Sequence, residues 1–230
     1  MFCIFPNFVL VFVVPLFRSG RKNSETFGDS MTRTVVFHIM NCGKGVGKKN
    51  TPSELRQLSV SGEAHLRGTE LNAAYCSDMP CINDALEYIL QVRDEGLKVV
   101  PHEAFFAREM LTEVFGAELR RLGERIGKHA TAEDWLKEWP QSQVIAERIT
   151  KGMRGIASDI VRENEMRRMP WHVLVGYHAP LCGLAAIKPH DIGPIGFADI
   201  VRYTLRHNGS TWSMISSLRL PCPTPNKSRP

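Results

Sequence analysis

Two short apolar runs that each end in a histidine constrain the fold of this chain more than any other feature. Residues 34–38 lie near the start of the chain, and residues 171–178 follow about 140 residues later. Valine-rich runs of this kind predict β-strands, and a polar side chain at the end of a buried strand lies at the carboxyl edge of a sheet, where open α/β folds bind ligands. Either histidine alone is more often a packed or surface residue. Together they predict one pocket, in which His38 and His178 lie within about 5–10 Å of each other.

The remaining pattern alternates strands with helices and ends in a hairpin. Residues 78–92, 104–128, 135–139 and 145–164 have helical periodicity, and Ser59 is a candidate cap for an earlier helix that reaches Leu71. Residues 97–100 predict a further strand, and Asn208 with Gly209 predicts a tight turn near the end of the chain. The expected fold is therefore α/β: three α/β/α layers, a mostly parallel sheet with helices on both faces, and a C-terminal hairpin.

The two ends of the chain differ in composition from the part between them. Residues 2–17 are almost wholly apolar, are interrupted by Pro6 and Pro15, and lack the charge pattern of a secretory signal. Residues 1–30 are therefore expected to lie outside the fold, either as an extension upstream of a natural start at Met31 or as a membrane anchor. Residues 31–220 are expected to form one domain, and residues 221–230 a disordered tail.

Composition excludes some classes of function. The chain has 230 residues, of which 43% are hydrophobic and 23% charged, and this suffices for one sizeable core. The net charge of +5 is mild, and no basic stripe interleaved with aromatic residues indicates nucleic-acid binding. Six cysteines lack the spacing of a disulfide framework, which favours reduced thiols and a cytoplasmic protein: Cys3, Cys42, Cys76, Cys81, Cys182 and Cys222.

Several weak motifs follow one another in the order found in a known family. Residues 35–39 end a strand in a histidine, residues 58–62 read Leu-Ser-Val-Ser-Gly, and residues 74–81 and 173–180 give two further strand ends. In this order the sequence resembles the histidine phosphatase superfamily. The first two motifs of that family are Leu-x-Arg-His-Gly and Leu-Thr-x-x-Gly. They are followed by a strand that ends in serine before an arginine-bearing helix, and later by a strand that presents a second histidine. The resemblance covers residues 32–218 and implies the phosphoglycerate mutase-like fold.

The resemblance also implies roles for particular residues. His38 would attack phosphorus, His178 would stabilise the transferring group, and either Glu109 or Glu103 would protonate the leaving oxygen. Ser77 and Cys81 lie where the family contacts the phosphate. Lys44 and Lys48 are close in sequence to His38, so they are candidates to replace part of the missing positive charge. The implied partner is a phosphorylated small molecule or a phosphoprotein; no metal, other cofactor or nucleic acid is implied, and a membrane only if the leader is an anchor.

The departures from the family motifs bear on activity. The family clamps the phosphoryl oxygens with two arginines, because a guanidinium can donate two charge-assisted bonds to a phosphate. This chain has Phe37 and Cys81 at those two positions, and Ile39 where the motif has glycine. Loss of one preorganised donor of this kind typically costs on the order of a hundredfold in rate. Two hypotheses stay open: a divergent phosphatase, and a catalytically inactive protein that binds an anionic ligand or a protein partner.

Two other kinds of site are weaker alternatives. Residues 43–50 are rich in glycine and lysine, but Cys42 and Lys49 stand where a phosphate-binding loop needs a glycine and a hydroxyl group. Two histidine–cysteine pairs have a spacing of four residues, His38 with Cys42 and His178 with Cys182. Imidazole and thiolate are ligands that zinc prefers. Neither pattern matches a known nucleotide or zinc motif.

Overall fold

The computed structural model describes residues 32–43, 48–107, 113–127, 129–163 and 170–223. The chain divides into two units, Met1–Ser30 and Met31–Pro230, and all described residues belong to the second. The predictions made for residues 1–30 and for most of the C-terminal tail lie outside the described residues. Within the described part of the chain, no helix is long and apolar enough to cross a membrane.

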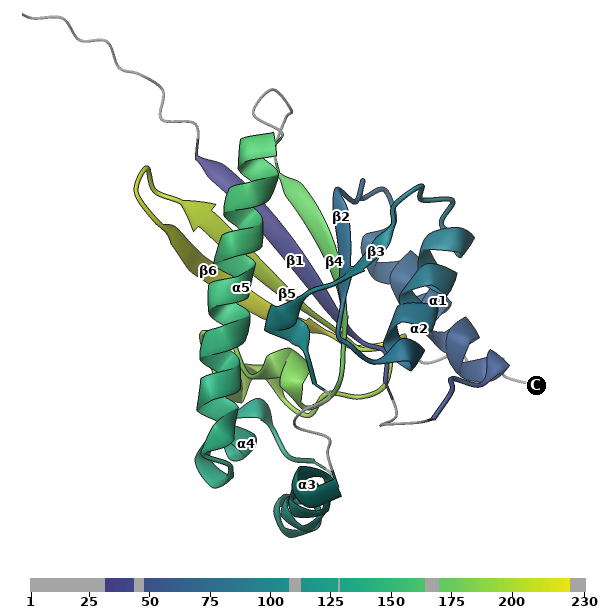
Figure 1. The fold of residues 1–230 in the computed structure, drawn as a ribbon, viewed down its shortest axis with the longest axis vertical. Helices are drawn as coiled ribbons and strands as arrows, with labels where there is room; N and C mark the ends of the chain where they lie inside the picture. Colours follow the sequence, from purple (N-terminus) through teal and green to yellow (C-terminus); the bar gives the residue numbers. More distant parts are fainter. Residues whose placement is uncertain (1–31, 44–47, 108–112, 128, 164–169, 224–230) are drawn as a thin grey trace, which may run out of the picture. The chain divides into compact units, whose positions relative to one another are not determined.

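A six-stranded sheet runs through the second unit in the order β3-β2-β4-β1-β5-β6 (Figure 1). The first four of these strands are parallel neighbours, whereas β5 is antiparallel to β1 and β6 is antiparallel to β5. The strands are β1 (Arg33–Asn41), β2 (Ala73–Cys76), β3 (Val99–Pro101), β4 (Trp171–Tyr177), β5 (Ile200–His207) and β6 (Trp212–Leu220). The α/β class, the mostly parallel sheet and the C-terminal hairpin are confirmed.

Helices cover both faces of this sheet. The helices are α1 (Pro52–Leu66), α2 (Pro80–Val92), α3 (Glu113–Ile126), α4 (Ala132–Glu138), α5 (Gln141–Glu163) and α6 (Pro189–Ile192), with 3-10 turns η1 (Glu103–Phe105) and η3 (Leu181–Gly183). A Cβ on Gly176 would lie 2.7 Å from Ile82 of α2, whereas the ring of the next residue, Tyr177, meets Phe105 of η1. Because successive strand side chains alternate between faces, α2 and η1 lie on opposite sides of the sheet. Figure 1 shows α5 crossing the face that η1 also covers.

The start of α1 differs from the expectation based on Ser59. Thr51 is the N-cap, the backbone N–H of Thr51 donates to the carboxylate of Glu54 at 2.8 Å, and Pro52 occupies the first helical turn. A proline is favoured there because it needs no backbone N–H. Ser59 is instead an interior residue of α1, and the helix ends at Leu66, before Leu71. The capping pattern expected at Thr131 is confirmed, because its hydroxyl accepts a bond from the Asp134 N–H.

The two histidine-bearing strands end differently. β4 ends at Tyr177, so His178 directly follows it, as the sequence predicts. β1 does not end at His38 but continues through Ile39 and Met40 to Asn41, because these residues pair with β4 on one side and β5 on the other. The expected end of the first strand at His38 is therefore wrong by three residues.

Candidate functional site

The carboxyl edge of the parallel strands brings Cys42 and Gly43 beside His178. The backbone N–H of Cys42 donates to the carbonyl of Tyr177 at 3.0 Å, which extends the pairing of β1 with β4 to the residue before His178. A Cβ on Gly43 would lie 2.9 Å from Cδ2 of the His178 imidazole. Only a glycine leaves room for the imidazole at this distance, so the sequence Cys42-Gly43 is what permits His178 to pack against the end of β1.

His38 lies in the middle of β1 and has a different partner. It stands opposite Leu174, four residues before His178, which corresponds to a separation of about 13 Å along the strands. The expected approach of His38 to His178 is therefore wrong. The Nε2 atom of His38 lies 3.1 Å from Nδ1 of His172, and the two rings stack with their centroids 5.4 Å apart. Only 1% of His38 is exposed.

Burial and its neighbours keep His38 uncharged. Burial, the guanidinium of Arg202 and the imidazole of His172 lower the pKa of His38 from its ordinary 6.5 to about 3. Arg202 faces His38 directly across the antiparallel pairing of β1 with β5. The Nδ1 atom of His38 is buried and has no hydrogen-bond partner among the described residues. His38 thus behaves as a packed core histidine, the ordinary alternative for such a residue.

Asn41 is the last residue of β1, and Cys42 and Gly43 directly follow it, so these three residues lie at the strand end where the sequence pattern predicts Phe37, His38 and Ile39. Phe37 and Ile39, which the sequence places at the motif's arginine and glycine, are completely buried in the core instead. The sequence contained one signal for the later strand end, because the glycine expected after the strand is found at Gly43 and not at position 39. The β-branched run before His38 concealed that signal.

Two asparagine amides hold this edge together. The side chain of Asn41 donates to the carbonyl of Gly196 at 2.9 Å and accepts from the N–H of Ala179 at 3.1 Å. The side-chain nitrogen of Asn50 donates to the carbonyls of Cys42 and Cys81, both at 3.1 Å. These bonds join the ends of β1 and β4 to the start of α2 with neutral groups, so they supply no positive charge for a bound anion.

The thiols and the imidazole at the edge are uncharged. Burial raises the pKa of the Cys42 thiol, which is completely buried, and nearby Cys81 raises it further. Burial also raises the pKa of Cys81 in the first turn of α2. Burial lowers the pKa of His178, whose Nδ1–H donates to the carbonyl of Ala179. Its Nε2 atom is therefore a buried lone pair, and within the described ranges it has no partner. A neutral thiol is a poor nucleophile, because the thiolate is the reactive form.

The other predicted site residues are dispersed or undescribed. Ser77 follows β2, is 1% exposed, and its hydroxyl accepts a bond from the N–H of Met79 at 3.3 Å. Lys48 is exposed. Glu103 is exposed in η1, on the opposite side of the sheet from α2. Glu109 and Lys44, with the glycine-rich segment 44–47, lie outside the described residues.

The weaker zinc hypothesis finds no support at this edge. In the ranges that the structure describes, no group of three or more histidine, cysteine, aspartate or glutamate side chains is arranged to hold a metal ion. The described cysteines are all free thiols.

Solved structures with similar folds were found by structural comparison. The crystal structure of phosphoglycerate mutase from Bacillus anthracis str. Sterne matches 80% of this chain and 93% of its own, with 13% sequence identity and a TM-score of 0.53. The native structure of a mycobacterial glucosyl-3-phosphoglycerate phosphatase matches 80% of this chain and 98% of its own, with 13% identity and a TM-score of 0.47. No protein-family model and no curated protein matches the sequence. The likeness to phosphoglycerate mutase, together with the strand order, shows that the chain has a phosphoglycerate mutase-like fold.

Proposed function

We propose that this protein is a catalytically inactive member of the histidine phosphatase fold, a pseudophosphatase that binds a phosphorylated ligand without hydrolysing it. The observation that carries the proposal is the end of β1, where a completely buried thiol, Cys42, stands beside His178. Hydrolysis through a phosphoenzyme needs an accessible nucleophile at this point. Cys42 is a neutral thiol in a closed site, so it does not meet that need.

The electrostatics of the edge support the same proposal. The transferring phosphoryl group carries negative charge on its equatorial oxygens, and enzymes stabilise it with arginine, lysine or a metal ion. The described residues that directly follow β1, β2 and β4 include neither arginine nor lysine: they are Cys42 and Gly43, Ser77 to Met79, and His178 to Pro180. Lys44 comes next after Gly43 and lies outside the described residues. A dianion placed here would exchange its hydration for neutral amides and thiols.

The competing hypothesis is an active phosphatase in which His38 attacks phosphorus, His178 assists, and Glu103 or Glu109 donates the proton. It requires a free imidazole lone pair that a phosphate ester can reach. The Nε2 atom of His38 is within hydrogen-bonding distance of His172, and its Nδ1 atom is buried. These contacts favour the inactive protein over the phosphatase.

Hydrolysis of 4-nitrophenyl phosphate by the full chain tests the proposal. We expect the parent protein to release nitrophenol no faster than buffer, and His38→Leu and His178→Leu to give the same background. Hydrolysis above background that either replacement abolishes would support the phosphatase instead. Hydrolysis that persists unchanged in both variants would come from a contaminating enzyme or from another site, and in either case it would not support His38 as the nucleophile.

A further inference from the structure

A groove with a volume of about 680 Å³ lies between η1 and α5, on the sheet face opposite α2. One stripe of α5 lines it, because Arg148, Gly152, Gly155 and Asp159 are spaced by three or four residues along the helix. Figure 1 shows η1 and α5 side by side, and a Cβ on Gly152 would lie 2.1 Å from the Cβ of Ala104 in η1. The absence of a side chain at Gly152 therefore allows α5 to pack closely against η1. At Gly155 a Cβ would meet nothing within 4 Å, so the groove remains open there.

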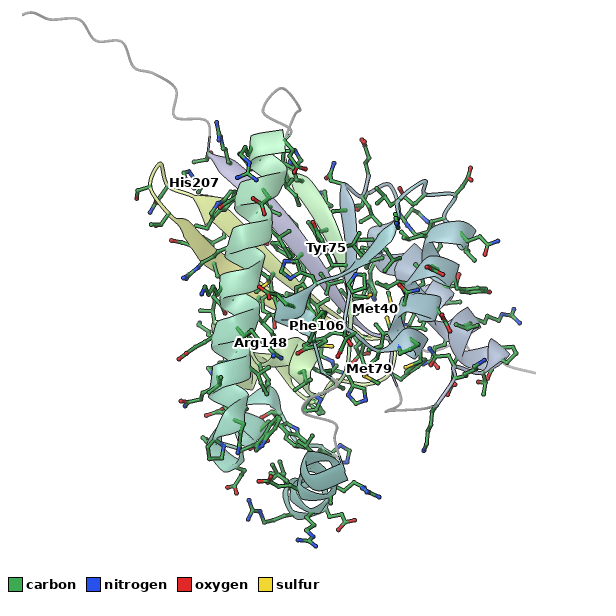
Figure 2. The ribbon with its side chains drawn as sticks, viewed as in Figure 1. Met40, Tyr75, Met79, Phe106, Arg148 and His207 are labelled. Carbon is green, nitrogen blue, oxygen red and sulfur yellow. The ribbon has the colours of Figure 1, made fainter. Side chains whose placement is uncertain are left out.

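Arg148 supplies a fixed positive charge to this groove. Its Nη2 atom donates to the carbonyl of Phe106 at 2.6 Å, and Figure 2 shows the two residues next to each other. Its Nε–H is buried without a partner among the described residues, and no carboxylate in the described ranges lies within 4 Å of the guanidinium. The guanidinium also lies near the Tyr177 hydroxyl at the end of β4. The groove thus holds the cation that the carboxyl edge lacks.

Two further donors face the same groove. Lys151 is exposed on α5, three residues after Arg148, and it lines the groove. His102 accepts a bond from the Ala104 N–H on its Nδ1 atom at 3.2 Å, so in the neutral ring Nε2 carries the proton. A Cβ on Gly152 would lie 3.8 Å from Cε1 of this imidazole, which places the ring against the floor of the groove. Guanidinium, ammonium and imidazole N–H are the groups that bind phosphate oxygens in proteins.

Two acidic residues, Glu103 and Asp159, also line the groove. Burial lowers the pKa of His102, and both carboxylates act on His102 in the opposite direction. Asp159 is already paired with Arg162 at 2.8 Å, so its charge is compensated within α5. Glu103 is exposed in η1 and can turn toward solvent. The neutral middle of the groove consists of Ala104, Gly152 and Gly155, which can accept the uncharged body of a ligand.

We propose that this groove binds the phosphate group of a phosphate monoester, with Arg148, Lys151 and His102 as its donors. The inference rests on the proposed function and names its binding site: the phosphorylated ligand is held on the η1 and α5 side and not at the closed edge beside Cys42. A dianionic phosphate is favoured over a carboxylate, because two cations and a neutral donor line the same groove.

Titration calorimetry with phenyl phosphate tests the site, and benzoate is the matched ligand with the same ring and a carboxylate. Lys151→Glu should weaken phenyl phosphate binding by about tenfold or more, because it replaces an attractive charge with a repulsive one. Arg154→Glu makes the same charge change on an exposed position of α5 outside the groove, and it should alter the affinity far less.

Gly155→Leu is a second variant that tests the site without changing charge. A Cβ at this position meets nothing within 4 Å, and leucine is a larger side chain and a better helix former than glycine, so it should occupy the groove while the protein stays folded. Thermal unfolding checks that expectation. Loss of phenyl phosphate binding in a folded Gly155→Leu variant supports the site.

The outcomes separate this inference from the proposed function. Binding that both Lys151→Glu and Gly155→Leu weaken supports the groove, whereas no binding by the parent, or binding that both variants leave unchanged, overturns it. Equal binding of benzoate contradicts the preference for a dianion. Phenol release, measured in the same samples, contradicts the inactive-protein proposal and not the location of the ligand.

Discussion

Single residues decide what the edge of the sheet can do. Gly43 allows the His178 imidazole to lie against the end of β1, and the neighbouring Cys42 thiol is completely buried. The Asn41 amide donates to the carbonyl of Gly196 and accepts from the N–H of Ala179. The described side chains at the end of β1 are therefore closely packed and uncharged.

Gly43→Ala should destabilise the protein by about 1–3 kcal/mol, because the added methyl group would overlap the His178 ring in a packed site. Urea unfolding measures the change in the free energy of unfolding. Gly96→Ala is the matched control, since a Cβ there would meet nothing within 4 Å. If both variants are equally stable, the contact of Gly43 with His178 is not as described.

His38 should make the folded protein sensitive to acid. Burial holds the pKa of folded His38 near 3, whereas in the unfolded chain it has its ordinary value of 6.5. As the pH falls through this window, the unfolded state gains a proton that the folded state does not bind, so stability is lost. The loss attributable to His38 is at most about 5 kcal/mol.

The measurement is the free energy of unfolding as a function of pH in the parent and in His38→Leu. The variant should have a flatter profile between pH 6.5 and 3, because the titrating group is gone. A profile in His38→Leu that is as steep as that of the parent would show that His38 is not the group responsible. Burial also lowers the pKa of His172, so a residual slope is expected.

At the scale of elements, local sequence patterns predicted where helices and strands occur better than where they end. Three local patterns each predicted a feature that the structure contains: the valine-rich runs, Asn208 with Gly209, and the Thr131 cap. The end of β1 depends on its two neighbouring strands, β4 and β5, which extend it to Asn41. The start of α1 depends on Thr51 and Pro52, whose signal was stronger than that of Ser59.

The contact between α5 and η1 depends on one glycine. Gly152→Ala should separate the two elements and cost about 1–3 kcal/mol, because a methyl group would lie 2.1 Å from the Ala104 side chain. Gly155→Ala, three residues further along the same helix, meets no neighbour and should stabilise the protein by up to about 1 kcal/mol. Thermal unfolding of the two variants under identical conditions gives the comparison. Equal shifts of the same sign would contradict the close packing of α5 on η1.

At the scale of the whole molecule, fold and chemistry were predictable to different degrees. The order of strands and helices follows from alternation in the sequence, and the likeness to a phosphoglycerate mutase confirms the fold. The sequence did not predict which residue stands at the end of β1, because His38 and Cys42 both lie close to that end. Only the pairing of β1 with its neighbouring strands shows that the strand continues past His38. The groove beside α5 is formed by residues more than 40 positions apart in the sequence, so no local sequence pattern predicts it.

Trapping of a phosphoenzyme tests the central claim most directly. The full chain is incubated with a phosphate ester carrying radioactive phosphorus, denatured at alkaline pH to preserve phosphohistidine, and digested for mapping of the label. We expect no acid-labile label on any histidine, because His38 is buried against His172 and the residue that follows β1, Cys42, is a buried thiol. Acid-labile phosphate on His38 that is absent from His38→Leu would contradict it.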